Sequence, residues 1–173
     1  DPLWSRGLGD VYKRQGWDQT ILQCVETHTQ GPIMTAKTFF ITGANSGFGF
    51  AIAGAALRAG HKVIGTVRSD EARRSLLERL PKAHAVLCDI TDFDRIEGIA
   101  LQAEADFGPV DVLINNAGYG HEGVLEESPL SEMQRQFDVN VFGAVAVAKA
   151  FLPRFRHRRS GFVVNVTSMG GLS

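Results

Sequence analysis

Short apolar runs alternate with helix-like segments from Met34 to the end of the chain. Each run is apolar throughout instead of alternating apolar and polar residues, which is typical of strands buried on both faces of a parallel sheet. Right-handed crossovers through the intervening helices then predict a doubly wound α/β domain. The runs predicted to be strands are KTFFITG, HKVIGTV, AHAVLCDI, PVDVLINNAG and GFVVNVTS.

Four segments between these runs have helical character. The first, 46–60, ends at Gly60, a plausible C-cap, and the second, 70–80, is stopped by a proline. The third begins near Thr91 or Asp92, either of which can be its N-cap. The last is expected to be one long helix from Ser131 to about Arg156, and its apolar part, 141–152, predicts a buried helix.

Residues 1–33 lack the periodicity of the rest and do not read as a secretory signal. Read back into DNA, the hexapeptide DVYKRQ resembles the mosaic end of a transposase-based sequencing adaptor. We therefore expect a non-native leader over 1–33 and a single domain over 34–173. A genuine disordered arm is the alternative for the leader.

Composition narrows the function classes. The chain has 173 residues, of which 44% are hydrophobic, and a net charge of −1, so bulk charge does not favour binding to nucleic acid or to a membrane surface. No apolar run is long enough to cross a bilayer. Cys24 and Cys88 make neither a disulfide framework nor a metal site, which favours a reduced, cytoplasmic setting and predicts no metal.

The stretch TGANSGFG joins the first strand to the first helix. Gly43 lies where the strand must turn, Gly47 lets the backbone approach a phosphate, and Gly49 lets the helix pack closely. The helix N-terminus then offers free N–H groups and the positive end of its dipole. In this strand–turn–helix context the pattern predicts a cradle for a dinucleotide.

The glycine spacing Gly-x-x-x-Gly-x-Gly is accompanied by CDITD (88–92), NNAG (115–118), Asn140 in FDVNVFG, and VNVTS (164–168). In their order and spacing these motifs resemble the short-chain dehydrogenase/reductase family, in its compact single-domain, retinol/steroid-dehydrogenase-like branch, from about Lys37 to the last residue. The resemblance implies a Rossmann fold that usually has about seven strands. With five strands, the chain is expected to be a fragment truncated before its C-terminal strands.

The same resemblance implies a nicotinamide cofactor. Val67 occupies the place where NAD-type members carry an acid, and Arg68 follows it. A guanidinium suits a 2′-phosphate, so NADP(H) is favoured over NAD(H), which stays possible. The alternative is that Arg68 is solvated and Asp70 is a helix N-cap.

The family's cofactor contacts map onto three further segments. Asp89 and Ile90 are implied to contact the adenine, and NNAG to line the ribose side, where binding and structural roles of Asn115 and Asn116 overlap. The implied cofactor-binding residues are Gly43, Asn45, Ser46, Gly47, Phe48, Gly49, Arg68, Asp89, Ile90, Asn116, Ala117 and Gly118.

The implied reaction interconverts an alcohol and a carbonyl, with a small-molecule substrate. Ser168 is implied to hydrogen-bond the substrate oxygen and Asn140 to support a proton relay. The family's Tyr-x-x-x-Lys pair is missing, because neither Tyr12 nor Tyr119 heads one. The fragment is therefore expected to be inactive, and a non-catalytic dinucleotide-binding sensor is the alternative function.

Other features are interpreted as structural. The helix around 141–152 is implied to form the interface of a homodimer or homotetramer. His121 is interpreted as a loop residue, the basic run 154–159 as a solvated helix end, and Cys88 as core packing. The glycine spacing argues against an extended-branch epimerase.

Overall fold

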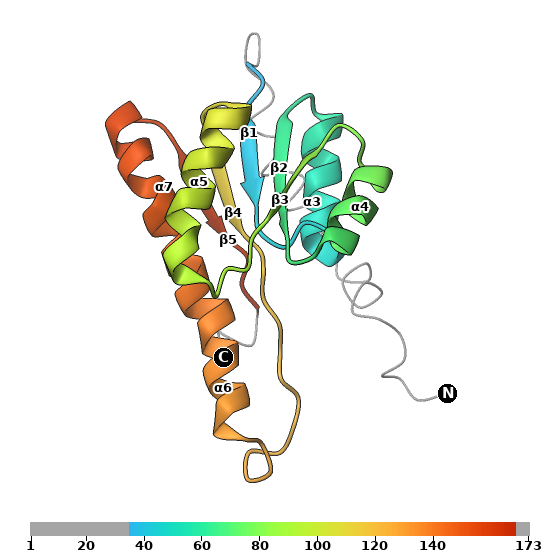
Figure 1. Cartoon of the computed structure of the whole chain (residues 1–173), viewed down its shortest axis with the longest axis vertical. Coiled ribbons are helices and arrows are strands. Elements are labelled where there is room, and N and C mark those ends of the chain that lie inside the picture. The colour runs from blue at the N-terminus through green and yellow to red at the C-terminus, as the bar shows by residue number, and fades with distance from the viewer. Residues whose placement is uncertain (1–34, 169–173) are drawn as a thin grey trace.

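The computed structural model describes residues 35–168, and the expected leader at 1–33 lies outside them. Five parallel strands form one sheet in the order β3-β2-β1-β4-β5, which confirms the predicted doubly wound class (Figure 1). In chain order the elements are β1 (Thr38–Ile41), α3 (Gly47–Arg58), β2 (Lys62–Val67), α4 (Asp70–Arg79), β3 (His84–Leu87), α5 (Phe93–Phe107), β4 (Val112–Asn115), α6 (Leu130–Phe137), the π-helix η2 (Asp138–Gly143), α7 (Ala144–Arg158) and β5 (Phe162–Asn165).

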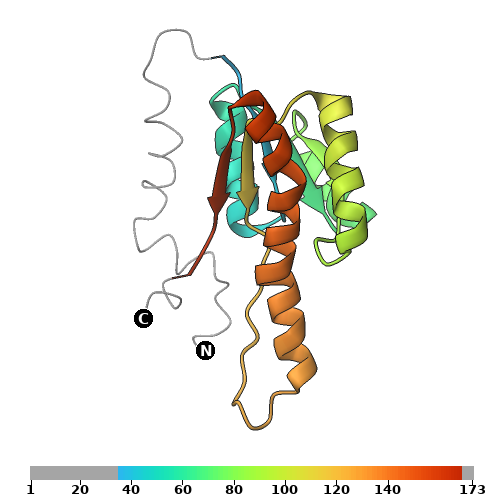
Figure 2. The ribbon, with the colours of Figure 1, turned by 90° about the vertical axis from the view of Figure 1, so that its left-hand side faces the viewer.

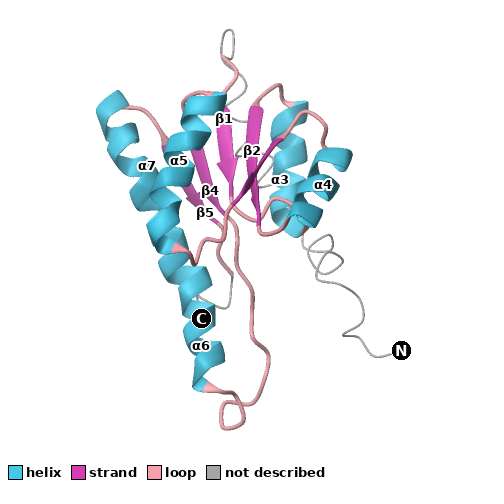
Figure 3. Cartoon of the chain, viewed as in Figure 1, coloured by secondary structure: helices cyan, strands magenta, loops and turns pink. Residues whose placement is uncertain are grey.

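Helices cover the sheet in two layers. Helices α3 and α4 lie on one face and α5 and α7 on the other (Figures 2 and 3). Alternate residues of β1 enter opposite cores: Phe39 and Ile41 pack with α3 and α4, whereas Phe40 packs with α5 and α7. All residues of β1 and β4 are buried, which explains why these strands are mostly apolar.

The predicted long helix is interrupted by a π-helical turn, which the sequence analysis did not anticipate. Segments α6, η2 and α7 follow one another without a break. The prediction that 141–152 is buried is wrong for much of this stretch, because Val141, Phe142, Val145 and Leu152 are exposed. Helix α7 packs on the sheet with one side only, through residues such as Val147 and Phe151, and this leaves its opposite side uncovered.

The helix ends differ in detail from the expectations. Helix α3 has its C-cap at Ala59, and Gly60 follows with a φ of 83°. Ser69 is the N-cap of α4, where its side chain accepts a hydrogen bond from the Ala72 N–H, so the alternative that Asp70 caps this helix is wrong. Asp92 is the N-cap of α5. Within residues 35–168, no helix has the length and apolar character needed to cross a membrane.

Candidate functional site

The three glycines after β1 meet different steric demands. Gly43 and Gly47 have φ values of 68° and 55°, which side chains rarely adopt. A Cβ atom on Gly47 would meet nothing within 4 Å, so this position is open. A Cβ atom on Gly49 would lie 2.3 Å from the Gly43 carbonyl oxygen and 2.5 Å from Asn116 Nδ2. Only glycine therefore lets α3 start this close to the turn.

Side chains at the carboxyl ends of three strands hold the turn in place. Thr42 Oγ1 accepts hydrogen bonds from the N–H groups of Asn116 and Ala117, each at 2.9 Å. Thr66 Oγ1 accepts one from the Gly43 N–H at 3.2 Å. Asn116 Nδ2 donates to the carbonyl oxygens of Thr42 and Gly43 at 2.9 and 3.2 Å. The carboxyl ends of β1, β2 and β4 are thereby tied together.

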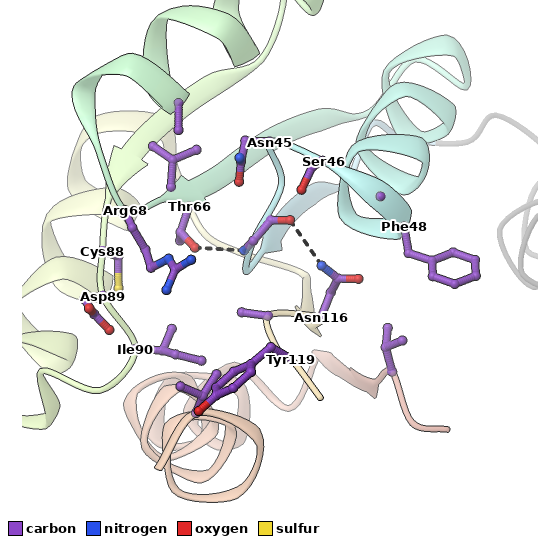
Figure 4. Close-up of a pocket in the computed structure, with 18 of the residues that line it drawn as sticks. Asn45, Ser46, Phe48, Thr66, Arg68, Cys88, Asp89, Ile90, Asn116 and Tyr119 are labelled. Carbon is purple, nitrogen blue, oxygen red and sulfur yellow. Dashed lines mark hydrogen bonds between the residues drawn. The ribbon is translucent and has the colours of Figure 1, made fainter. Parts of the chain in front are cut away.

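A cavity of about 1150 Å³ opens beside this turn, at the carboxyl ends of the strands (Figure 4). This edge is where ligands bind in open α/β sheets. Eleven of the twelve predicted cofactor-binding residues line it, and Gly49 lies behind the turn. The eleven are Gly43, Asn45, Ser46, Gly47, Phe48, Arg68, Asp89, Ile90, Asn116, Ala117 and Gly118.

Sequence reasoning missed several residues of the site. Arg135, Tyr119 and Val139 also line the cavity, as does the Thr66 hydroxyl that holds Gly43. Thr42 and Thr66 were detectable as polar residues within apolar strand runs, a pattern that indicates a hydrogen-bonding role. Arg135 gave no such signal, because an arginine on a polar helix is usually solvated.

The cavity combines positive charge with the N-terminus of a helix. Helix α3 has no acid in its first turn, and the side chain of its N-cap, Ser46, makes no capping hydrogen bond, so no carboxylate there competes with an anion for the positive end of the helix dipole. The side chain of Arg68 projects into the cavity, whereas the ring of Phe48 points away from the other labelled residues (Figure 4).

Asp89 and Cys88 have opposite pKa shifts. Burial acts to raise the pKa of the Asp89 carboxyl, but hydrogen bonds from the Thr91 N–H and hydroxyl, together with the charges of Arg68 and Arg135, lower it overall. Burial, helped by the charge of Asp89, raises the pKa of the Cys88 thiol to about 11. The thiol stays protonated, which agrees with a packing role for this buried residue.

The two predicted catalytic residues do not line the cavity. Asn140, on η2, binds the backbone of Tyr119: its Oδ1 accepts from the Tyr119 N–H at 3.0 Å and its Nδ2 donates to the Tyr119 carbonyl at 2.7 Å. Tyr119 in turn lines the cavity. Ser168 is exposed and lies beyond Val166, the residue after β5 that does line the cavity.

The neighbouring asparagines of NNAG have separate contacts. Asn115 is buried, and its Nδ2 donates to Asn165 Oδ1 at 2.9 Å and to the Ala144 carbonyl at 3.3 Å, so it joins β4 to β5 and α7. Asn116 holds the glycine turn and lines the cavity. Over residues 35–168, no group of three or more His, Cys, Asp or Glu side chains is placed to bind a metal ion.

The similarity to known proteins covers the part of the chain that contains this domain. The sequence model of a family described as short chain dehydrogenase matches residues 37–173. Oxidoreductase BOA17 of Botryotinia fuckeliana is 38% identical over 137 residues, which cover 78% of this chain and 50% of the relative. The 3-ketodihydrosphingosine reductase of Bacteroides thetaiotaomicron is 37% identical over 139 residues, covering 80% and 49%.

Solved structures agree with these relatives. A short-chain dehydrogenase from Streptomyces avermitilis superposes with a TM-score of 0.75 at 46% identity, covering 80% of this chain and 52% of the other. An alcohol dehydrogenase from the archaeon Thermococcus sibiricus, complexed with 5-hydroxy-NADP, gives a TM-score of 0.71 at 29% identity, covering 78% and 59%. The chain thus spans about half the length of the curated relatives it matches.

Proposed function

This chain belongs to the short-chain dehydrogenase family, and from that premise we propose that the whole protein is an NADP(H)-preferring oxidoreductase. It interconverts an alcohol and a carbonyl compound, both small molecules, by hydride transfer. The observation that carries the proposal is the cavity at the strand ends, lined by the glycine turn and by Arg68. A bound nicotinamide dinucleotide supplies or accepts the hydride.

The residues of the cavity fit such a cofactor. Gly47 leaves open space beside the acid-free N-terminus of α3, which suits a pyrophosphate. Arg68 projects into the cavity next to Ser69, where a guanidinium can pair with a 2′-phosphate. Val67 leaves this place without the acid that would select NAD(H).

We assign the remaining roles by position. Asn45, Ser46 and Phe48 flank the pyrophosphate, Asp89 and Ile90 face the adenine, and Asn116, Ala117 and Gly118 follow the ribose. Ser168 hydrogen-bonds the reacting oxygen of the substrate. Asn140 supports the proton relay while it holds the backbone of Tyr119. Because the sequence has no Tyr-x-x-x-Lys pair, the 173-residue chain by itself should show no more than trace turnover.

Cofactor binding provides the direct test. We expect NADPH, followed by its fluorescence, to bind this chain about tenfold or more tightly than NADH, because the 2′-phosphate gains a charge-assisted pair. Arg68→Ala should remove the preference, while Arg74→Ala, an exposed arginine on α4, should keep it. Equal affinities in the wild type, or a preference that survives Arg68→Ala, would contradict NADP(H) selection.

A non-catalytic dinucleotide sensor on the same fold is the second candidate, because the cavity and its glycine turn fit cofactor binding whether or not a reaction follows. Both candidates bind the cofactor, but only the oxidoreductase consumes it. NADPH oxidation by the product of the complete gene, assayed with a panel of aldehydes and ketones, separates them. Turnover with any panel member excludes the sensor.

We also propose that the whole protein is a cytoplasmic homodimer or homotetramer. Helices α6 and α7 and the intervening η2 carry the exposed apolar residues Phe137, Val141, Phe142 and Val145, which suit an interface between copies. Phe142→Glu should shift the protein to monomers in sedimentation or light scattering. An unchanged assembly would place the interface elsewhere.

A further inference from the structure

The glycine turn is held differently at its two ends. Its first residues are bound from inside the fold, where Gly43 contacts Thr66 and Asn116. The segment from Asn45 to Gly47, which lines the cavity as Gly43 does, receives a side-chain contact from the other direction. The Asn45 carbonyl oxygen accepts a hydrogen bond from Arg79 NH1 at 3.3 Å.

Arg79 is itself well placed for this contact. It is the last residue of α4, and its guanidinium carbon lies 3.6 Å from the ring centroid of Phe50 on α3. Stacking on the ring sets the plane of the guanidinium, and the hydrogen bond sets its direction. Arg79 is not among the residues that line the cavity, so it reaches the turn from outside.

Because the peptide bond is planar, the contact with the Asn45 carbonyl also fixes the direction of the Ser46 N–H. The described chain has no cis peptide bonds, and in a trans peptide the carbonyl and the following N–H point in opposite directions. A cation on the Asn45 carbonyl therefore turns the Ser46 N–H away from itself. Asn45 and Ser46 both line the cavity (Figure 4). The positive charge also polarises the peptide and strengthens this N–H as a donor.

We propose that Arg79 is a positioning residue that orients the Asn45–Ser46 peptide toward the pyrophosphate of the bound dinucleotide. The inference rests on the proposed function. It separates the tasks of two arginines, Arg68 just before α4 and Arg79 at its end. Arg68 acts inside the cavity on a group that only NADP(H) carries, whereas Arg79 acts from outside on a group common to both cofactors.

The test compares Arg79→Met with Arg73→Met. Methionine keeps much of the apolar length of the side chain and removes its charge and hydrogen bonds. Arg73 is on the same helix and faces Asp70 at 4.0 Å, so its replacement makes the same change of charge away from the turn. We expect Arg79→Met to weaken NADPH and NADH binding by the same factor, about tenfold, as for a lost charge-assisted hydrogen bond.

Two further measurements separate positioning from stability. With both proteins at the same fractional saturation with NADPH, inorganic pyrophosphate should displace the cofactor from the wild type at concentrations about tenfold lower than from Arg79→Met. The melting temperatures of the ligand-free Arg79→Met and Arg73→Met variants should agree. Arg79→Lys, which keeps the charge but loses the planar stack, should weaken both cofactors by about threefold.

The outcomes distinguish the inference from the function on which it rests. The inference is overturned if Arg79→Met binds both cofactors as the wild type does, if it loses affinity for NADPH alone, or if Arg73→Met loses as much. Should Arg79→Met fail to fold, wild-type affinity in Arg79→Lys overturns it. A wild-type chain that binds neither dinucleotide overturns the proposed function itself, and the inference with it.

Discussion

Strands β1 and β5 have similarly apolar sequences, TFFI and FVVN, yet their environments are opposite. Every residue of β1 is buried and every residue of β5 is exposed. Strand β1 lies between β2 and β4 with helices on both faces, whereas in the described part of the chain β5 pairs with β4 alone. An apolar run therefore predicts a strand, but its burial depends on the layers that cover it.

The functional site likewise differs between its β1 side and its β5 side. Around the carboxyl ends of β1, β2 and β4 the cavity is organised by hydrogen bonds: Thr66 and Asn116 hold Gly43, and Thr42 holds Asn116. On the β5 side it is lined by Val166, while Ser168 lies outside the lining. The half proposed to hold the cofactor is thus built within residues 35–168, where the β5 side contributes Val166 to the lining.

The largest expected effect compares one residue type in the two strands. Phe40 on β1 is 2% exposed and Phe162 on β5 is 50% exposed. Phe40→Ala should lower the free energy of unfolding by about 3–5 kcal/mol, because it removes a buried ring and leaves a cavity. Phe162→Ala should cost less than about 1 kcal/mol. Urea denaturation measures both, and equal losses would mean that β5 is covered in solution.

Sequence patterns located the strands and the glycine turn because these features are local, whereas the other predicted lining residues came from the family resemblance. A strand, a glycine turn and a helix start follow one another within TGANSGFG, so their contacts are set by neighbours in the chain. The contacts of Arg79 with Asn45 and of Asn140 with Tyr119 join segments 34 and 21 residues apart. No spacing rule predicts such pairs, and the π-turn η2 has no residue signature of its own.

The next effect concerns the attachment of α7, the helix that packs against β5. Glu104 on α5 is largely buried, and it binds Arg154 Nε at 2.9 Å, Arg158 at 3.2 Å and the Val110 N–H at 2.9 Å. Glu104→Gln should lower the free energy of unfolding by about 1.5–3 kcal/mol, since two cations lose their partner.

Hydrogen exchange sharpens this second prediction. The amides of α7 and β5 should lose protection in Glu104→Gln, while those of β1 and β2 keep theirs. Asp92→Asn is the matched control, because Asp92 pairs with Arg95 at 3.6 Å on the surface and should cost less than about 0.5 kcal/mol. Uniform loss of protection would show that α7 is not a separate unit of stability.

The third prediction uses pH to test the buried region around β1 and β2. His61, just before β2, is buried and stacks on Phe39 with ring centroids 5.1 Å apart. Burial, with the charge of Lys37, lowers the pKa of His61 against the opposing charge of Asp111. The unfolded chain then takes up a proton at a higher pH than the folded one, so stability falls as the pH drops below about 6.5.

Thermal melting checks this dependence. Between pH 7.5 and pH 5.5 the wild type should lose melting temperature, and His61→Gln should lose less, because the variant cannot titrate there. The difference between the two proteins should no longer change with pH above about pH 7.5, where His61 is neutral in both states. An identical slope in both would assign the pH dependence to other groups.

The smallest expected change in stability lies on β5 itself. Val164 is 45% exposed, so Val164→Lys should change the free energy of unfolding by less than about 0.5 kcal/mol. An exposed apolar edge strand nevertheless invites pairing between chains, and lysine opposes such pairing. Light scattering of concentrated protein should therefore decrease.

Leu101→Lys on α5, at 51% exposure, adds the same charge away from the edge and should leave the scattering higher than Val164→Lys does. If both variants reduce it equally, net charge and not the exposed strand governs self-association, and the contrast between β1 and β5 has no consequence for how the chains associate.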